Sequence, residues 1–369
     1  MIGEKHFSFI ALGGGNNVGG SCYALRAGDN IILLDAGIRY TADFVTRLPD
    51  VKPLYDFWKI EGLWDIRALV ISHSHNDHAG AVPFFAQNMT GGKIYSSEAV
   101  PEMIFAVNSP ASKSADMIIP VPYGEKYYAG GWAITLFPAG HIPGASMTLL
   151  EIDGAKILYT GDFCTFDQFT VNGANIPEMK IDTLICETTY GYTKSSGKTD
   201  INILAEKINS AMNRTDTFTC TLRNAGKESE FALAVNECVN LGLIPDIDIW
   251  IDPEFSGICS AVSKWGKSQI LGGRVRLLDD WRNFHGGCVI TPGNFGGYYE
   301  LGFNMPNHSG CDEILNLIAR TKPDRIIFIH GIPLTGGTRN ILQEVRERFG
   351  SSIETIHSTD GTETNLLRE

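Results

Sequence analysis

The first 190 residues of the chain consist of short apolar runs separated by glycine-rich turns. These runs are rich in β-branched residues and are bounded by turn-forming residues, which is the pattern of buried strands. A helical stretch, AGAVPFFAQN (79–88), lies among them, and the pattern as a whole indicates stacked sheets. We predict strands at HFSFIAL (6–12), CYALRA (22–27), NIILLDAG (30–37), ALVIS (68–72), WAITLF (132–137), MTLLEID (147–153), KILYTGD (156–162) and TLICET (183–188).

The pattern changes near residue 193, where the polar stretch YTKSSGKTD (192–200) separates two parts of the chain. Strand-like and helix-like segments then alternate, which is typical of a parallel sheet covered by helices. We therefore predict an α/β protein with a first domain over 1–193, a short inserted domain over 194–299 and the completion of the first domain over 300–369. The alternating segments are INILAEKINSAMN, TFTCTL, SEFALAVNECVNLG, DIDIWID and GICSAVSKWG, and then DEILNLIAR, RIIFIHG and TRNILQEVRERFG after residue 300.

Composition narrows the class of protein. The chain has 369 residues, 43% of them apolar, and a formal net charge of −12, which argues against a broad basic surface for nucleic acid. Bound divalent cations can still supply positive charge beside a phosphate, so a nuclease is not excluded. The sequence lacks an apolar stretch long enough for a membrane span and a signal-peptide pattern, and its eight cysteines lie in no CxxC pair. We expect a cytoplasmic protein with reduced thiols and no membrane partner.

The stretch HSHNDHAG (73–80) follows the predicted strand ALVIS and places three histidines and an aspartate within six positions. His73 and His75 are two residues apart, so an extended backbone points both side chains to one side. Asp77 and His78 follow and can face a second ion. A lone histidine would be an ordinary loop residue, but this cluster predicts a metal site whose ion the pattern leaves open.

Three further candidates stand at the ends of other predicted strands. His141 follows WAITLF within a glycine-proline turn, Asp162 follows KILYTG, and His330 follows RIIFI. Each alone could be a capping aspartate or a loop histidine. Their shared position at strand ends is what indicates a common site, in which a carboxylate such as Asp162 can bridge two ions.

The order His73-x-His75-x-Asp77-His78, His141, Asp162 and His330 resembles the metallo-β-lactamase superfamily, and more narrowly the β-CASP nucleases, the group that contains RNase J and the cleavage-and-polyadenylation endonuclease. The glycine-rich opening LGGGNNVGGS (12–21), the strand that ends at Asp35 and the motif ICETTYG (185–191) around Glu187 are similar to those of this group. The segment after residue 193 runs like a shortened β-CASP insertion. The resemblance implies a metallo-β-lactamase αββα sandwich with a small β-CASP-like α/β domain inserted into it.

The resemblance also implies roles for single residues. Two Zn²⁺ ions per chain are expected, with Mn²⁺ as the alternative: His73, His75 and His141 hold one ion, Asp77, His78 and His330 hold the other, and Asp162 bridges them. His308, in NHSGCDEILNLIARTKPDRIIFIHG (307–331), matches a histidine of the group that precedes a helix and the last metal ligand; the alternative is a histidine that caps this helix. The implied catalytic residues are Asp77, His308 as general acid and Glu187 as the group that orients it. We expect Asp35 to orient the ligand loops and not to bind metal; the alternative is an ordinary aspartate of a strand-end turn.

Arg223 and Lys227 lie at a predicted strand-to-helix junction, where they could bind substrate phosphate or be ordinary surface charges. The glycine-rich stretch 12–21 fits no phosphate-loop motif and reads as a turn beside the metal site. The leading hypothesis is a metal-dependent phosphodiesterase that cuts single-stranded RNA, as an endonuclease or a 5′-exonuclease, with a homodimer or protein partner supplying RNA grip. The alternatives are a small-molecule metallo-hydrolase (thioesterase, lactonase or nucleotide phosphodiesterase), a single-stranded DNA nuclease and a catalytically silent scaffold.

Overall fold

The fold was analysed in a computed structural model that describes residues 6–40, 45–107, 110–193, 197–222, 225–279, 284–293, 296–331 and 341–368. The chain divides into two compact units. Unit 1 comprises Met1–Thr165, Gly173–Ser196 and His308–Glu369, and unit 2 comprises Phe166–Asn172 and Gly197–Asn307. The domain limits expected from the sequence, after residues 193 and 299, remain a prediction.

The first sheet of unit 1 has seven strands in the order β21-β1-β2-β3-β6-β7-β8. The strands β21, β1, β2 and β3 pair in an antiparallel manner, whereas β3, β6, β7 and β8 are parallel. Parallel neighbours bring their carboxyl ends to one edge of the sheet. The bounds are β1 Phe7–Gly13, β2 Cys22–Ala27, β3 Asn30–Leu34, β6 Ala68–Ile71, β7 Lys93–Ser97, β8 Ile118–Val121 and β21 Glu363–Asn365.

The second sheet of unit 1 repeats this plan in the order β20-β19-β13-β12-β11-β10-β9. The hairpin-connected strands β9 to β12 are antiparallel, and β12, β13, β19 and β20 are parallel. Outside both sheets, β4 (Arg39–Tyr40) pairs with β5 (Thr46–Arg47). The bounds are β9 Lys126–Ala129, β10 Trp132–Pro138, β11 Ser146–Ile152, β12 Ala155–Tyr159, β13 Thr183–Glu187, β19 Arg325–Ile329 and β20 Glu354–His357.

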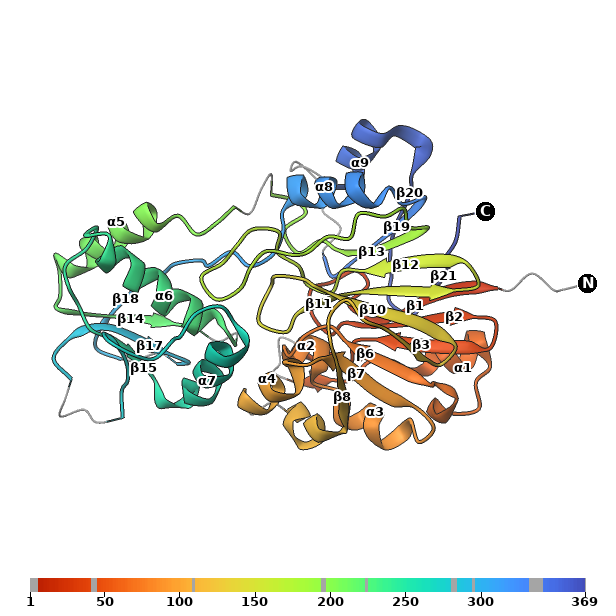
Figure 1. The fold of residues 1–369 in the computed structure, drawn as a ribbon, viewed down its shortest axis with the longest axis horizontal. Helices are drawn as coiled ribbons and strands as arrows, with labels where there is room; N and C mark the ends of the chain where they lie inside the picture. Colours follow the sequence, from red (N-terminus) through yellow and green to blue (C-terminus); the bar gives the residue numbers. More distant parts are fainter. Residues whose placement is uncertain are drawn as a thin grey trace, which may run out of the picture. The chain divides into compact units, whose positions relative to one another are not determined.

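The two sheets pack face to face because alternate residues of both are apolar. Phe9 and Ile32 of the first sheet share one buried cluster with Trp132, Ile134 and Ile157 of the second. The opposite face of the first sheet is covered by helices on one side of the sandwich, and α8 and α9 lie beside the second sheet on the other (Figure 1). The predicted αββα sandwich is therefore confirmed. The helices are α1 Lys52–Trp58, α2 Asn76–Ala79, α3 Val82–Asn88, α4 Val100–Ala106, α8 Cys311–Thr321 and α9 Ile341–Phe349.

Unit 2 contains a five-stranded sheet in the order β16-β15-β17-β14-β18. Each neighbouring pair is parallel, so the parallel sheet predicted from the strand–helix alternation is confirmed. Helix α5 begins after Asp200, whose side chain accepts hydrogen bonds from two backbone N–H groups of the first turn. The bounds are α5 Ile201–Met212, β14 Thr217–Thr221, α6 Lys227–Asn240, β15 Ile249–Ile251, α7 Ser256–Trp265, β16 Val275–Leu277, β17 Gly287–Thr291 and β18 Tyr299–Glu300.

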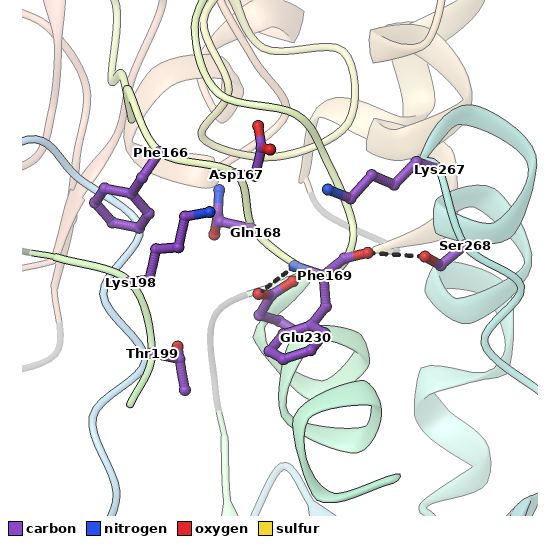
Figure 2. A pocket seen from close by; sticks show the side chains of 9 residues that line it. All are labelled: Phe166, Asp167, Gln168, Phe169, Lys198, Thr199, Glu230, Lys267 and Ser268. Atoms are coloured by element: carbon purple, nitrogen blue, oxygen red, sulfur yellow. Dashed lines mark hydrogen bonds between the residues drawn. The ribbon is translucent and has the colours of Figure 1, made fainter. Parts of the chain in front are cut away.

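The segment Phe166–Asn172 joins unit 2 through a buried glutamate of α6. Glu230 accepts hydrogen bonds from the backbone N–H groups of Phe169 (2.7 Å) and Thr170 (2.8 Å) and from the Thr170 hydroxyl (2.9 Å). Figure 2 shows this glutamate beneath a pocket of about 430 Å³ in unit 2. Two lysines, Asp167 and Glu230 line the pocket, so its formal charges balance: Lys198 and Lys267 against the two acidic groups.

All eight cysteines are buried, and none of them forms a disulfide: Cys22, Cys164, Cys186, Cys220, Cys238, Cys259, Cys288 and Cys311. Burial raises the pKa of the Cys22 and Cys288 thiols well above the usual value. Among the described residues, no helix combines the length and the apolar character that crossing a bilayer requires.

Candidate metal centre

Four of the ligands predicted from the sequence lie just beyond the end of a strand in unit 1. His73 follows β6, His141 follows β10, Asp162 follows β12 and His330 follows β19 directly. Asp77 and His78 sit in the single turn of α2, which opens after His75. Because two facing sheets deliver these side chains to one edge, residues more than 250 positions apart in the sequence converge.

The first group of donors consists of His73, His75, His141 and Asp162, whose ligand atoms all lie within 4.8 Å of one another. The Nδ1 atom of His75 is 3.1 Å from Nε2 of His73 and 3.2 Å from Nε2 of His141. The Oδ2 atom of Asp162 is 3.7 Å and 3.8 Å from the same two Nε2 atoms. Three imidazole nitrogens and one carboxylate oxygen thus lie close enough together to hold one ion, and such a donor set would suit zinc.

The second group consists of Asp77, His78 and His330. The Oδ2 atom of Asp77 is 3.9 Å from Nε2 of His78 and 3.5 Å from Nε2 of His330. Asp162 also faces this group, with Oδ2 3.3 Å from Nε2 of His78 and Oδ1 3.5 Å from Nδ1 of His330. One carboxylate therefore faces both groups of donors, which is the position of a bridging ligand.

The chemistry of the donors fits metal ions. Asp162 is 3% exposed, and within the described part of the chain its Oδ1 atom has no hydrogen-bond partner. A buried charged oxygen without a donor is costly unless a cation satisfies it. Facing ring nitrogens such as those of His73 and His75 also need a proton or a cation between them, because each neutral imidazole offers one lone pair.

The pKa values in the cluster are tuned by burial and by mutual charge. Burial, and then the neighbouring His78 and His75, hold the pKa of His73 well below its usual value, which favours the neutral ring that binds metal. Burial alone would raise the pKa of the Asp162 carboxyl, but His330, His78 and His308 hold it well below the usual range. The centre thus keeps a carboxylate ionised among imidazoles.

Asp35 orients two of the candidate ligands, His78 directly and His73 through Ser72. Its Oδ2 atom accepts hydrogen bonds from the Tyr159 hydroxyl (2.5 Å) and the Ser72 hydroxyl (2.7 Å), and lies 2.7 Å from Nδ1 of His78. Ser72 in turn lies 3.0 Å from Nδ1 of His73. With their Nδ1 atoms engaged in this way, both rings present Nε2 to the centre. Ser72 and Tyr159 carried no recognisable signal in the sequence.

Glu187 and His308 lie together beside the two groups. The Oε1 atom of Glu187 is 3.0 Å from Nδ1 of His308 and accepts the backbone N–H of Phe163 at 3.0 Å, while Oε2 accepts the N–H of Thr189 at 3.1 Å. Glu187 is 1% exposed, whereas His308 is 13% exposed. His308 precedes α8 but does not cap it, because Gly310 occupies the N-cap position. Glu187, Asp162 and His330 also form a third group of possible donors.

Of the two residues predicted to bind substrate phosphate, the structure describes only Lys227. Lys227 is the first residue of α6 and is half-buried, and burial lowers its pKa. Arg223 lies outside the described residues.

The glycine-rich stretch 12–21 lies beside the second group, as the sequence indicated. The Gly19 backbone N–H donates to Nε2 of His330 at 3.0 Å, and the Ser21 N–H donates to the carbonyl of Asp77 at 2.8 Å. Gly37, which packs here, has no room for a side chain, since a Cβ atom would lie 1.9 Å from the Asp77 carbonyl oxygen. His330 itself has a left-handed φ of 48°, an unfavourable conformation that surrounding bonds must maintain.

Comparison with known proteins gives one matching family and several curated relatives. Residues 15–167 match the family model described as Metallo-beta-lactamase superfamily. Endoribonuclease YSH1 of Yarrowia lipolytica is 33% identical over 50% of this chain and 24% of its own length. Cleavage and polyadenylation specificity factor subunit 3 of Dictyostelium discoideum is 33% identical over 49% of this chain and 25% of its own length.

A solved structure matches over a larger share of the chain. A protein of unknown function from Enterococcus faecalis V583 aligns with a TM-score of 0.64 and 11% identity, covering 98% of this chain and 100% of the other; at that identity the likeness concerns the fold. The chain spans about a quarter of the length of the first curated relatives. The family model and the curated relatives agree with the resemblance predicted from the motifs, and the solved structure shows a similar fold.

Proposed function

Because residues 15–167 match the family model of the metallo-β-lactamase superfamily, we propose that the chain is a metal-dependent phosphodiesterase of this superfamily that cleaves single-stranded RNA. The observation that carries the proposal is the pair Glu187–His308, with 3.0 Å between Oε1 and Nδ1, next to two groups of metal donors. Two metal sites that share a carboxylate, together with an imidazole that acts as a general acid, suit the in-line displacement of an alkoxide from phosphate. The relatives named as endoribonucleases support the same reading.

Two zinc ions fit the donor set. His73, His75, His141 and Asp162 would hold one ion, and Asp77, His78 and His330 would hold the other, with Asp162 shared between them. When bound, such ions lower the pKa of water to near neutrality and neutralise charge on the scissile phosphate. The absence of any thiolate from the donors favours zinc or manganese over softer metals.

The protein's own residues then divide the remaining work. The Nδ1–H of His308 faces the Glu187 carboxylate, which favours the imidazolium form of the ring. In that form Nε2 also carries a proton, which it can donate to the leaving 3′-oxygen. Glu187 is in turn held by the N–H groups of Phe163 and Thr189, which fixes the direction of the imidazole. Asp35, Ser72 and Tyr159 keep His73 and His78 in the orientation that presents Nε2.

The net charge of −12 favours a second candidate, a small-molecule metallo-hydrolase, because a long RNA would be repelled by most of the surface. If the substrate is RNA, the same charge makes a partner that supplies RNA grip part of our proposal, as either a second copy or another protein. A cytoplasmic location remains a prediction.

The test is cleavage of matched 5′-labelled single-stranded RNA and DNA oligonucleotides by zinc-loaded protein, with a chelator control and the variants Asp162→Ala and His308→Ala. We expect RNA products that disappear with chelator and are strongly reduced in both variants. The product ladder separates internal cutting from 5′ trimming. Absence of cleavage of either polymer by a protein that binds two ions would rule out an autonomous nuclease and direct attention to small esters and cyclic nucleotides.

A further inference from the structure

Asp360, from the carboxyl-terminal part of the sequence, forms hydrogen bonds with the first half of the glycine-rich stretch Gly13–Gly20. Asp360 lies in the turn between β20 and β21; its Oδ1 atom accepts the Gly15 N–H at 2.7 Å, and its Oδ2 atom accepts the Asn17 side-chain amide at 3.1 Å. The neighbouring Gly361 N–H donates to the carbonyl of Ala11 at 2.8 Å. Asp360 thus holds the loop through two bonds that converge on one half-buried carboxylate.

The other side of the same loop holds His330. The Gly14 carbonyl accepts the backbone N–H of His330 at 2.7 Å and the Tyr23 hydroxyl at 3.0 Å, and the Gly19 N–H donates to Nε2 of His330 at 3.0 Å. Both the main chain and the ring of His330 are therefore bound by one loop. These bonds also hold the left-handed φ of His330, which is unfavourable for a residue with a Cβ atom.

A loop of this composition does not hold a fixed shape by itself. Gly14 and Gly19 have φ values of 73° and 89°, a region that glycine enters freely but in which its unfolded alternatives are also many. External bonds must therefore supply the order, and Asp360 is the charged group that supplies two of them. We propose that Asp360 is a positioning residue of the metal centre, which sets the geometry of His330 through the glycine-rich loop; this inference rests on the proposed role of His330 as a ligand.

The proposal has a consequence for the backbone amide of Gly19. A neutral imidazole has one nitrogen lone pair, and Nε2 of His330 offers it to the Gly19 N–H while it also faces Oδ2 of Asp77 at 3.5 Å. An ion held by Asp77, His78 and His330 would need that lone pair, and the Gly19 N–H would then lose its acceptor. A buried N–H that loses its acceptor must find another, and the Gly19 amide therefore reports loading of the second group.

The experiment compares Asp360→Ala, Asp360→Asn and the control Glu363→Ala. Glu363 belongs to the same carboxyl-terminal segment, but its carboxylate bonds to the Trp58 ring N–H at 2.7 Å and not to the loop. Asparagine retains an oxygen for the Gly15 N–H. After a flip of the Asn17 amide, whose nitrogen now faces Asp360, the asparagine NH2 can donate to Oδ1 of Asn17, which has no partner among the described residues. Asp360→Asn should therefore restore what Asp360→Ala loses.

Two readouts that need no RNA are used, namely hydrogen exchange of the Gly15 and Gly19 amides in metal-free protein, and zinc affinity by chelator competition. For Asp360→Ala we expect about 10-fold faster exchange at both amides and about 10-fold weaker binding of one zinc ion, as is usual when an outer partner of a ligand is lost. Binding of the other ion should not change. Asp360→Asn and Glu363→Ala should behave as the unmodified protein, in which zinc should alter the Gly19 amide signal.

Unchanged zinc affinity and exchange in Asp360→Ala would overturn the proposal, as would equal damage in Asp360→Asn and Asp360→Ala. Equal weakening of both ions would also overturn it, because the effect would then be a general loss of structure. Two-zinc binding with this pattern but without RNA cleavage would leave the inference standing and reject the proposed function. If the unmodified protein binds no zinc, the proposed centre fails and this inference fails with it.

Discussion

Both units of the molecule contain buried carboxylates, but the pKa values of these carboxyl groups are shifted in opposite directions. In unit 1, His330, His78 and His308 hold the pKa of the Asp162 carboxyl well below its usual range although burial would raise it. In unit 2, burial raises the pKa of Glu228 to about 7 and also raises the pKa of Glu230. Hydrogen bonds from N–H and hydroxyl groups oppose both shifts, and the charge of Lys267 also opposes the shift of Glu230. The difference lies in the neighbours and not in the depth of burial.

This contrast separates a centre that holds cations from acidic groups that serve the fold. Asp162 has an oxygen without a hydrogen-bond partner in the described structure, whereas Glu230 is satisfied by three donors from Phe169 and Thr170. A buried charge that lacks donors calls for an ion, and a buried charge that is saturated by donors orders the backbone. The unit 1 carboxylates are therefore expected to matter for chemistry and those of unit 2 for stability.

The largest expected effect is that of Asp162→Ala. Removal of the carboxylate shared by both donor groups should weaken both ions, and each bound ion supplies several kcal/mol of charge stabilisation. RNA cleavage should fall by at least about 10,000-fold, measured as single-turnover rates at saturating zinc. Retention of more than a tenth of the rate would contradict the bridging role, and Glu230→Ala serves as the matched carboxylate control from unit 2.

His308→Ala should reduce cleavage by about 1,000-fold without loss of metal, which is within the range for a general acid. The loss should nearly vanish for a phosphodiester whose leaving group is p-nitrophenolate, because that group needs no proton. The comparison is made as kcat for the two substrates with metal content measured in parallel. An equal loss on both substrates would assign His308 to binding or to structure.

Glu228→Gln should change the pH dependence of unit 2. A carboxyl whose pKa is about 7 when folded and 4.5 otherwise binds its proton more tightly in the folded state, so stability falls as pH rises from about 4.5 to about 7. The difference of about 2.5 in pKa corresponds to up to about 3 kcal/mol above pH 7. Glutamine removes this penalty. Urea unfolding at pH 5 and pH 8, followed by exchange of α6 amides, should show a smaller fall of stability with rising pH in Glu228→Gln than in the unmodified protein.

Glu230→Ala has the smallest expected effect, a destabilisation of unit 2 by about 2 kcal/mol, because three donors of the segment 166–172 lose their acceptor. The free energy of unfolding is measured in urea, with Glu237→Ala on the same helix as control. A value within 0.5 kcal/mol, the usual range for ordinary surface changes, would show that the segment is held by other contacts.

The strand ends and the ligand candidates could be predicted because they depend on local patterns. Strand β2 has the predicted bounds. The three histidines and the aspartate between His73 and His78 form a cluster that has few explanations other than a metal site. The attachment of the segment 166–172 to α6 left no local signal, since Glu230 reads as one more acid in the first turn of a helix. The bonds of Asp35 to Tyr159 and of Asp360 to Gly15 join residues 124 and 345 positions apart, and neither periodicity nor spacing encodes such pairs.

The most direct test of the contrast between the units is the number of zinc ions bound per chain, measured by native mass spectrometry after exchange into zinc-containing buffer. We predict two ions for the unmodified protein and for Glu230→Ala, and one or none for Asp162→Ala. Fewer than two ions in the unmodified protein, or two ions retained in Asp162→Ala, would contradict the assignment of the unit 1 carboxylates to a two-ion centre.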